Sequence, residues 1–272
     1  MKQFNLVKNA FLFIFIIFIC SFQDDQIQPI ESIHSFNEFN FKSIKSGTLV
    51  IFDVDETLIQ PVDTYLMNEY TSDAKKLKKG LFQRYPEVKD WNDLASIMLL
   101  EAHRPLLEPM IIQKIQELKR RNIIVIACTG INIGSLGRVH SLEEWRYTQL
   151  KSLGFEGSYG NLVLKLSGFK RNPGFYRGVL STDLELKGPV IGEFLDQIGL
   201  RPQKIVMFDD NLDFLKSVKK ECKKRGIIFD GYKYKGFKSK TWDEALIQFQ
   251  ADYLIRNKKW INDKEARAKM DK

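Results

Sequence analysis

Short apolar runs alternate with amphipathic stretches along most of the chain. Six runs contain mainly hydrophobic residues, at positions 49–52, 123–128, 162–166, 178–180, 205–208 and 227–229. Runs of this length without polar alternation are typical of strands that are buried on both faces. The stretches between them include a helical period that begins near Pro109 and a capping box that begins at Ser141. Strands that alternate with helices predict an α/β fold, a doubly wound (Rossmann-like) parallel sheet flanked by helices.

Two helical stretches stand outside this alternation. Residues 60–104 are mainly helical in pattern and are too long for a simple connection, so we expect a small helical cap insertion after the first strand. The insertion is expected to act as a lid over the end of that strand. Residues 242–260 have the pattern of an amphipathic helix, in which Ala245, Phe249 and Leu254 are predicted to face inward.

The N-terminal segment differs from the rest of the chain. Two lysines precede an apolar segment at positions 10–20, and residues 1–22 therefore predict a signal peptide, with an uncleaved N-terminal anchor as the alternative. The bulky residue before Cys20 disfavours lipidation. We expect export to the periplasm, secretion, or membrane attachment through this segment. A linker is predicted at 23–46 and a single domain, including the cap at about 60–104, at 47–272.

Composition and charge narrow the class of protein. The 272 residues are 44% hydrophobic and 28% charged, which is typical of a globular protein with a sizeable core. The formal charge of +8 falls to +6 if the two lysines of the N-terminal segment are removed. The lysine-rich stretch 216–225 has apolar residues on its opposite face and predicts a solvated helix surface, so we expect no nucleic-acid partner. After such a removal only Cys128 and Cys222 remain, which indicates no disulfide framework.

Carboxylates follow two of the apolar runs directly. Asp53 and Asp55 end the first run, and Asp209 and Asp210 end the fifth. The carboxyl ends of parallel strands meet at one edge of a sheet, so at least three carboxylates are expected to come together there. Carboxylates this close repel each other unless a cation compensates. A set of oxygen ligands without His or Cys specifies a hard ion, and Mg²⁺ fits best.

Two further positions suit a phosphate. Thr129 and Gly130 end the second run and can offer a hydroxyl and a backbone N–H to a phosphate oxygen. Lys187 comes just before a helical stretch, where a cation suits an anion that also faces the helix N-terminus. Each signal is weak alone, because strands often end in Thr-Gly turns and most lysines are solvated.

In this order the motifs resemble those of the haloacid dehalogenase-like (HAD) superfamily of phosphatases and phosphotransferases. The resemblance runs from Asp53 to Asp213 and covers essentially everything after the linker. Within that superfamily, three segments resemble an uncharacterised exported bacterial subfamily that is catalogued as a domain of unknown function. These segments are 143–147, 187–188 and 259–263.

The resemblance implies a mechanism and a set of site residues. Asp53 would be the nucleophile that forms an aspartyl-phosphate, and Asp55 the acid and base that protonates the leaving alkoxide and then activates water. The phosphate-binding residues would be Thr129, Gly130 and Lys187. The Mg²⁺ ligands would be Asp53, Asp55 through its backbone carbonyl, Asp210 and Asp209, with Asn211 and Asp213 in support. Thr57 is expected to fix the turn after Asp55.

The predicted function is a Mg²⁺-dependent phosphatase that hydrolyses a phosphate monoester of a small molecule outside the cytoplasm. The presence of Asp55 favours phosphoryl chemistry over dehalogenation, because a halide leaving group needs no proton. Two alternatives stay open: a catalytically silent secreted interaction protein on the same fold, and a phosphotransferase that passes phosphate to an alcohol. Specificity is expected to reside in residues 60–104 and 130–186, but the sequence names neither the substrate nor the oligomeric state.

Overall fold

A computed structural model describes residues 29–271 and contains one mostly parallel sheet. The described strands are β1 (Glu31–Ile33), β2 (Thr48–Asp53), β3 (Ile124–Thr129), β4 (Val163–Lys165), β5 (Gly174–Tyr176), β6 (Val179–Ser181), β7 (Lys204–Asp209) and β8 (Ile228–Tyr234). They form a sheet of eight strands in the order β1-β8-β7-β2-β3-β6-β5-β4. All neighbours are parallel except at the β4-β5-β6 edge, where the pairs are antiparallel.

The order of the strands creates a switch point at the centre of the sheet. The chain runs outward from β2 through β3 to β6, returns to pair β7 on the other side of β2, and continues to β8. In such sheets ligands bind beyond the carboxyl ends of the strands where the direction reverses, here between β2 and β7. The predicted α/β, doubly wound (Rossmann-like) fold is confirmed.

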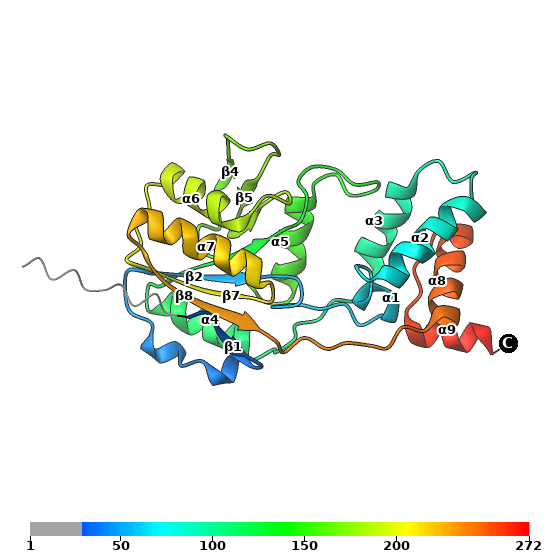
Figure 1. Ribbon diagram of the computed structural model, residues 1–272, viewed down its shortest axis with the longest axis horizontal. Helices are drawn as coiled ribbons and strands as arrows, with labels where there is room; N and C mark the ends of the chain where they lie inside the picture. Colours follow the sequence, from blue (N-terminus) through cyan, green and yellow to red (C-terminus); the bar gives the residue numbers. More distant parts are fainter. Residues whose placement is uncertain (1–28, 272) are drawn as a thin grey trace, which may run out of the picture.

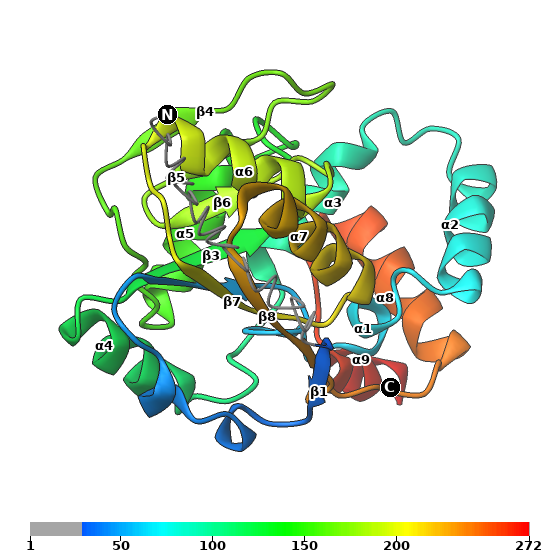
Figure 2. The same ribbon diagram turned by 60° about the vertical axis from the view of Figure 1, so that its left-hand side comes forward.

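Helices cover both faces of this sheet (Figures 1 and 2). They are α4 (Ile111–Arg120), α5 (Leu142–Ser152), α6 (Lys187–Gln197) and α7 (Leu212–Arg225). Successive residues of β2 serve opposite faces, because side chains alternate along a strand. Val50 and Phe52 pack into the core with α4 and α5, and Leu49 and Ile51 into the core with α6 and α7. All six residues of β2 are buried, which explains why its sequence lacks polar alternation.

The segment before β2 differs from the predicted linker. Residues 31–46 contain β1 and two short 3-10 turns, and they bury Phe36 and Phe41 in the core on the α4 face. The Phe36 ring packs edge-on against Phe52 and Phe208, with centroids 5.7 and 5.5 Å away. Polar residues surround Phe36 in the sequence, so the pattern did not predict its burial in the core.

The remaining helices lie together beyond the carboxyl ends of the parallel strands (Figure 1). They are α1 (Thr64–Met67), α2 (Ser72–Arg84), α3 (Trp91–Glu101), α8 (Glu244–Asn257) and α9 (Asp263–Met270). The cap therefore combines the insertion after β2 with helices from the C-terminal end of the chain. Leu77, Leu94 and Ile97 share one apolar cluster with Ile247 and Leu254 of α8.

The inward face of α8 was predicted only in part. Leu254 is buried as expected and Phe249 is partly buried, but Ala245 is exposed. The buried stripe passes instead through Leu246 and Ile247. Ala245 carries too little apolar surface to fix which side of the helix faces the core.

Polar contacts join the two parts of the cap to each other and join the cap to the loop after β3. Trp260 Nε1 donates to Asp63 Oδ2 at 3.0 Å, which ties the C-terminal segment to the start of α1. On the other side, Arg138 Nε in the loop after β3 pairs with Asp93 Oδ1 of α3 at 2.8 Å. Gly137 has a φ of 51°, and an added Cβ there would collide with the backbone of Asn92. The loop after β3 is thus pressed directly against the cap.

The N-terminal predictions fall outside the described residues. The predicted signal peptide or anchor, residues 1–22, is not described, so export and lipid attachment stay predictions. Within residues 29–271, no helix has the length and apolarity needed to cross a membrane. Cys128 and Cys222 are buried free thiols.

Replacing Ile247 by alanine tests whether α8 is part of the cap core. The side chain is fully buried, and its loss should lower the free energy of unfolding by about 2–5 kcal/mol. Urea denaturation measures the change. Arg256→Ala, at an exposed position of the same helix, should shift it by less than about 0.5 kcal/mol. Equal effects of the two substitutions would contradict the packing described above.

Candidate active site

Three carboxylates meet at the switch point of the sheet. Asp53 ends β2 and Asp209 ends β7, immediately after the paired residues Phe52 and Phe208. One oxygen from each of Asp53, Asp209 and Asp210 lies within 4.8 Å of the other two. Asp53 is 5% exposed and Asp209 is fully buried. The apolar strands therefore place Asp53 and Asp209 where solvent hardly reaches them.

Lys187 supplies the positive charge of this cluster. It is the first residue of α6, its side chain is fully buried, and its Nζ donates to Asp53 Oδ1 and to Asp209 Oδ2, the latter at 2.7 Å. The ammonium also lies 4.8 Å from the centroid of the Phe214 ring. Burial opposes the charge of Lys187, but the carboxylates of Asp209 and Asp53 outweigh it and raise the pKa. Lys187 is therefore positively charged at neutral pH.

The position of Lys187 depends on the residue that follows it. An added Cβ on Gly188 would overlap the backbone carbonyl of Ser217 in α7. The backbone N–H of Gly188 donates to Ser217 Oγ at 3.1 Å. Close approach of α6 to α7 thus requires glycine here and sets Lys187 between the two strand ends.

Thr57 links the acids of β2 to those that follow β7. Its Oγ1 accepts a hydrogen bond from the backbone N–H of Asp210 at 3.1 Å. Before it, Glu56 adopts a φ of 61°, in the left-handed region, and donates its N–H to the carbonyl of Ile59 at 2.8 Å. Such strain in a non-glycine residue persists only where the surroundings enforce it. Thr57 thus holds two turns together, whereas the prediction placed its hydrogen bond within its own turn.

The electrostatics of the cluster favour a bound cation. Burial raises the pKa of Asp53 well above its usual range, against the opposing effect of Lys187. Burial also raises the pKa of Asp210 to about 7, and the charges of Asp209 and Glu56 add to the effect. One ammonium among three carboxylates leaves an excess of negative charge, and oxygen ligands alone suit Mg²⁺. The residues present therefore fit the predicted metal.

Asp55 lies on the open side of the cluster. Its side chain is 49% exposed, and its two carboxylate oxygens accept hydrogen bonds from Arg146 Nη2 at 2.9 and 3.0 Å. Thr129 Oγ1 donates to Asp55 Oδ2 at 3.2 Å. These contacts join the ends of β2 and β3 and hold the Asp55 carboxylate beside the buried acids.

Arg146 has no role in the sequence-based prediction, although it lies in one of the segments that carried the family resemblance. It extends from α5, its side chain is 4% exposed, and its Nη1 donates to Gln149 Oε1 at 2.8 Å. Its Nε is buried and has no hydrogen-bond partner among the described residues. Leu142 and Leu150, four residues on either side, are also buried. An arginine in the buried stripe of a helix was the signal that could have identified it.

The other predicted residues divide between the site and the surface. Gly130 lies in the loop after Thr129, and its N–H makes no hydrogen bond to another residue of the described range 29–271, so it can donate to a ligand. Asn211 caps α7 by accepting from the N–H of Asp213 at 2.9 Å, and its own N–H donates to Asp209 Oδ1 at 2.8 Å. The Asp213 side chain is 84% exposed and pairs with Lys216, away from the cluster.

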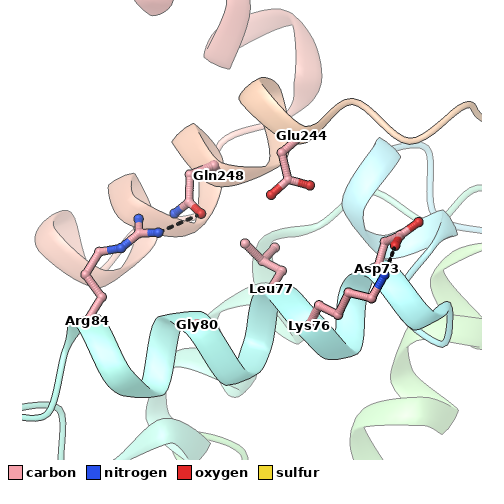
Figure 3. Close-up of a pocket in the computed structure, with 7 residues that line it drawn as sticks. All are labelled: Asp73, Lys76, Leu77, Gly80, Arg84, Glu244 and Gln248. Carbon is pink, nitrogen blue, oxygen red and sulfur yellow. Dashed lines mark hydrogen bonds and ion pairs between the residues drawn. The ribbon is translucent and has the colours of Figure 1, made fainter.

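A groove between α2 and α8 lies apart from these acids (Figure 3). It is lined by Asp73, Lys76, Leu77, Gly80, Arg84, Glu244 and Gln248. Its charges are mixed and partly paired: Lys76 contacts Asp73 at 3.2 Å, and Arg84 donates to Gln248 at 3.2 Å. None of the predicted site residues contributes to it.

Comparison with known proteins gives a family without an assigned activity. The family described as "Protein of unknown function (DUF2608)" matches residues 27–267. An uncharacterized protein of Rickettsia prowazekii is 24% identical over the whole of both chains. One of Rickettsia felis is 23% identical and covers 82% of this chain and 81% of its own.

A solved structure of a conserved haloacid dehalogenase-like protein of unknown function from Agrobacterium tumefaciens is also similar. It is 14% identical, covers 67% of this chain and 81% of its own, and has a TM-score of 0.34. Similarity at that level supports no conclusion about activity. The predicted resemblance to an uncharacterised family is confirmed, whereas membership of the HAD superfamily stays a prediction.

The raised pKa of Asp210 predicts a pH-dependent effect of Mg²⁺ on stability. The metal-free folded protein keeps this proton up to about pH 7, whereas the unfolded chain releases it near the usual value of 3.8. The resulting destabilisation therefore grows as the pH rises through this interval. A cation that takes the place of the proton removes the penalty, so Mg²⁺ should stabilise the protein more at pH 8 than at pH 5.

Thermal unfolding with saturating Mg²⁺ or with a chelator measures this difference. We expect the melting temperature to rise by about 5–10 °C at pH 8 and by much less at pH 5. Asp210→Asn should remove the pH dependence, whereas Asp213→Asn, in the first turn of α7 and exposed, should retain it. An equal rise at both pH values would contradict a metal site at these acids.

Proposed function

The chain belongs to the DUF2608 family, whose description assigns no activity, and from its site we propose that it is a Mg²⁺-dependent phosphatase of the HAD type. Its substrate would be a phosphate monoester, cleaved through an aspartyl-phosphate on Asp53. The observation that carries the proposal is the contact of buried Lys187 with both Asp53 and Asp209, beside Asp210 and at the switch point of the sheet. Nothing in the packing of an α/β core requires three acids at that position.

In the first step, a carboxylate oxygen of Asp53 attacks phosphorus and the bond from phosphorus to the ester oxygen breaks. Asp55 gives its proton to the leaving alkoxide, which departs as an alcohol. The Lys187 ammonium, the Thr129 hydroxyl and the Gly130 N–H would hold the phosphoryl oxygens. In the present structure the first two of these donors are occupied by carboxylates, which a bound phosphoryl group would replace as acceptors.

In the second step, Asp55 takes a proton from water, and the oxygen attacks the phosphorus of the aspartyl-phosphate. The bond to Asp53 breaks, and inorganic phosphate and the free carboxylate result. Mg²⁺ would be held by Asp53, Asp209, Asp210 and the backbone carbonyl of Asp55. Bound there, it would screen the repulsion between the anionic phosphate and the acids.

Replacing the proposed nucleophile is the direct test of this function. The purified protein should release phosphate from 4-nitrophenyl phosphate when Mg²⁺ is present, and Asp53→Asn should reduce the rate to background, because an amide cannot form the acyl phosphate. Asp73→Asn, an exposed acid of the cap, should leave the rate unchanged. Activity retained in Asp53→Asn would sink the nucleophile assignment, and phosphate passed mainly to an added alcohol would favour a phosphotransferase.

The role of Asp55 predicts a dependence on the leaving group. Nitrophenolate leaves readily without a proton, whereas an alkoxide needs one. Asp55→Asn should therefore lower kcat/KM about 10²- to 10⁴-fold for glycerol 3-phosphate and much less for 4-nitrophenyl phosphate. Arg146→Lys keeps the charge but loosens the hold on Asp55, so it should show the same pattern more weakly. Equal losses on both substrates would count against Asp55 as the acid.

A further inference from the structure

The second notable arginine near the site is Arg104, at the junction of cap and sheet. It follows α3 in a segment that runs beside the residues after the Asp55 turn. The N–H of Gln60 donates to the carbonyl of Pro105, and the N–H of Val62 to that of His103, both at 3.2 Å. Arg104 thus lies at the edge of the cap that is closest to the acids of β2.

One nitrogen of the Arg104 side chain is fixed and the rest of the guanidinium is free. Nη1 donates to the carbonyls of Met98, Leu99 and Ala102, at 3.4, 3.1 and 3.3 Å, at the C-terminal end of α3. Neither Nε nor Nη2 makes a hydrogen bond to another residue in the part of the chain that the structure describes. The side chain is half-buried and already immobilised, so a ligand would meet two donors in a set orientation.

Two of the carboxylates around Arg104 are engaged by other donors. Asp55 accepts from Arg146, and Asp63 accepts from Trp260. Among the described residues, no carboxylate lies within ion-pair distance of Arg104. Burial, together with the charge of Arg146, lowers the pKa of Arg104 against the opposing charges of Asp55, Glu69 and Asp63. These acids act on Arg104 from a distance, and none of them occupies its Nε or Nη2.

Tyr70 lies on the same side of the cap. It follows α1 and is 81% exposed, an unusual degree for so large an aromatic side chain. Partial desolvation, with the charges of Glu69, Asp55 and Glu56, raises the pKa of Tyr70, so these acids lie near enough to act on it. The charge of Arg104 acts on Glu69, the neighbour of Tyr70, so the exposed ring lies in the same region and can contact the organic part of a ligand whose charged end Arg104 binds.

We propose that Arg104 binds a second anionic group of the substrate, a carboxylate or a phosphate carried by the part of the molecule that leaves. Asp55, the proposed acid for the leaving oxygen, contacts Arg146, and the charges of both act on Arg104, so Arg104 lies near the side from which the alcohol would leave. This inference rests on the proposed phosphatase function and restricts its substrates to phosphate esters with a second negative group. Bidentate guanidinium contacts suit both anions.

Two matched pairs of ligands test the subsite. 3-Phosphoglycerate and glycerol 3-phosphate differ by a carboxylate, and fructose 1,6-bisphosphate and fructose 6-phosphate differ by a phosphate. Binding to the full-length Asp53→Asn protein with Mg²⁺, measured by calorimetry, reports affinity without turnover. We expect the doubly charged member of a pair to bind about 10- to 100-fold more tightly, which corresponds to hydrogen bonds with a charged group.

Substitutions assign the preference to Arg104. Arg104→Gln should bring the affinity ratio close to one, and Arg104→Lys should retain part of it. Arg84→Gln, on the far side of the cap, should keep the full ratio. Melting temperatures show whether a variant has also lost the contacts with the α3 carbonyls. If Arg104→Lys keeps the native melting temperature, a lower affinity ratio in that variant comes from the weakened ligand contact alone.

The outcomes separate this inference from the proposed function. A preference that Arg104→Gln removes supports the subsite, and the pair that shows it identifies carboxylate or phosphate as the ligand. Equal affinities, no binding, or a preference that survives Arg104→Gln would overturn it, even if the active protein hydrolyses all four compounds. A preference without any hydrolysis by the unsubstituted protein would support the subsite and overturn the phosphatase.

Discussion

The buried ammonium of Lys187 is the contact on which the arrangement of the site depends. It binds acids at the ends of two neighbouring strands from the first turn of α6, so it joins three elements at the switch point of the sheet. Removing one partner of a buried ion pair leaves the other uncompensated, at a cost of about 3–5 kcal/mol. The structure thus commits much stability to a cluster whose acids hold protons when no cation is present, and a bound cation could take the place of those protons.

The site is built from two layers with different tasks. The sheet supplies rigid strand ends, which hold Asp53 and Asp209 in fixed register and exclude water from them. The cap and α5 supply Arg104 and Arg146; Arg146 pairs with the more exposed Asp55, whose charge also acts on Arg104. Three segments connect these layers (Figure 1). Two are the ends of the α1–α3 insertion, and the third leads from β8 to α8. Contacts between the β3 loop and α3 hold the cap against the sheet, and under the proposed function the sheet would carry the chemistry and the cap would select the leaving group.

The sequence revealed those features that depend on local pattern. Apolar runs located β2, β3 and β7, and the acids at their ends followed from the rule that parallel strands meet at one edge. It did not reveal β1 and β5, strands of three residues: β1 exists only through pairing with the distant β8, and β5 is too short and Gly-containing to show a strand pattern of its own. Nor did it show that α8 completes the cap, because a single amphipathic helix does not indicate its partner. Arg146 was detectable as a charge in an apolar stripe, whereas Arg104 acquires its role only from the fold.

The central claim is that Asp53 becomes covalently phosphorylated. The most direct measurement mixes the protein with a substrate that it hydrolyses, quenches in acid during turnover, and reduces the acyl phosphate with borohydride. Mass spectrometry of the peptides then reports which aspartate has become homoserine. The account predicts homoserine at position 53, dependent on substrate and on Mg²⁺. Conversion at another acid, or turnover with no conversion in any acid of the chain, would contradict it.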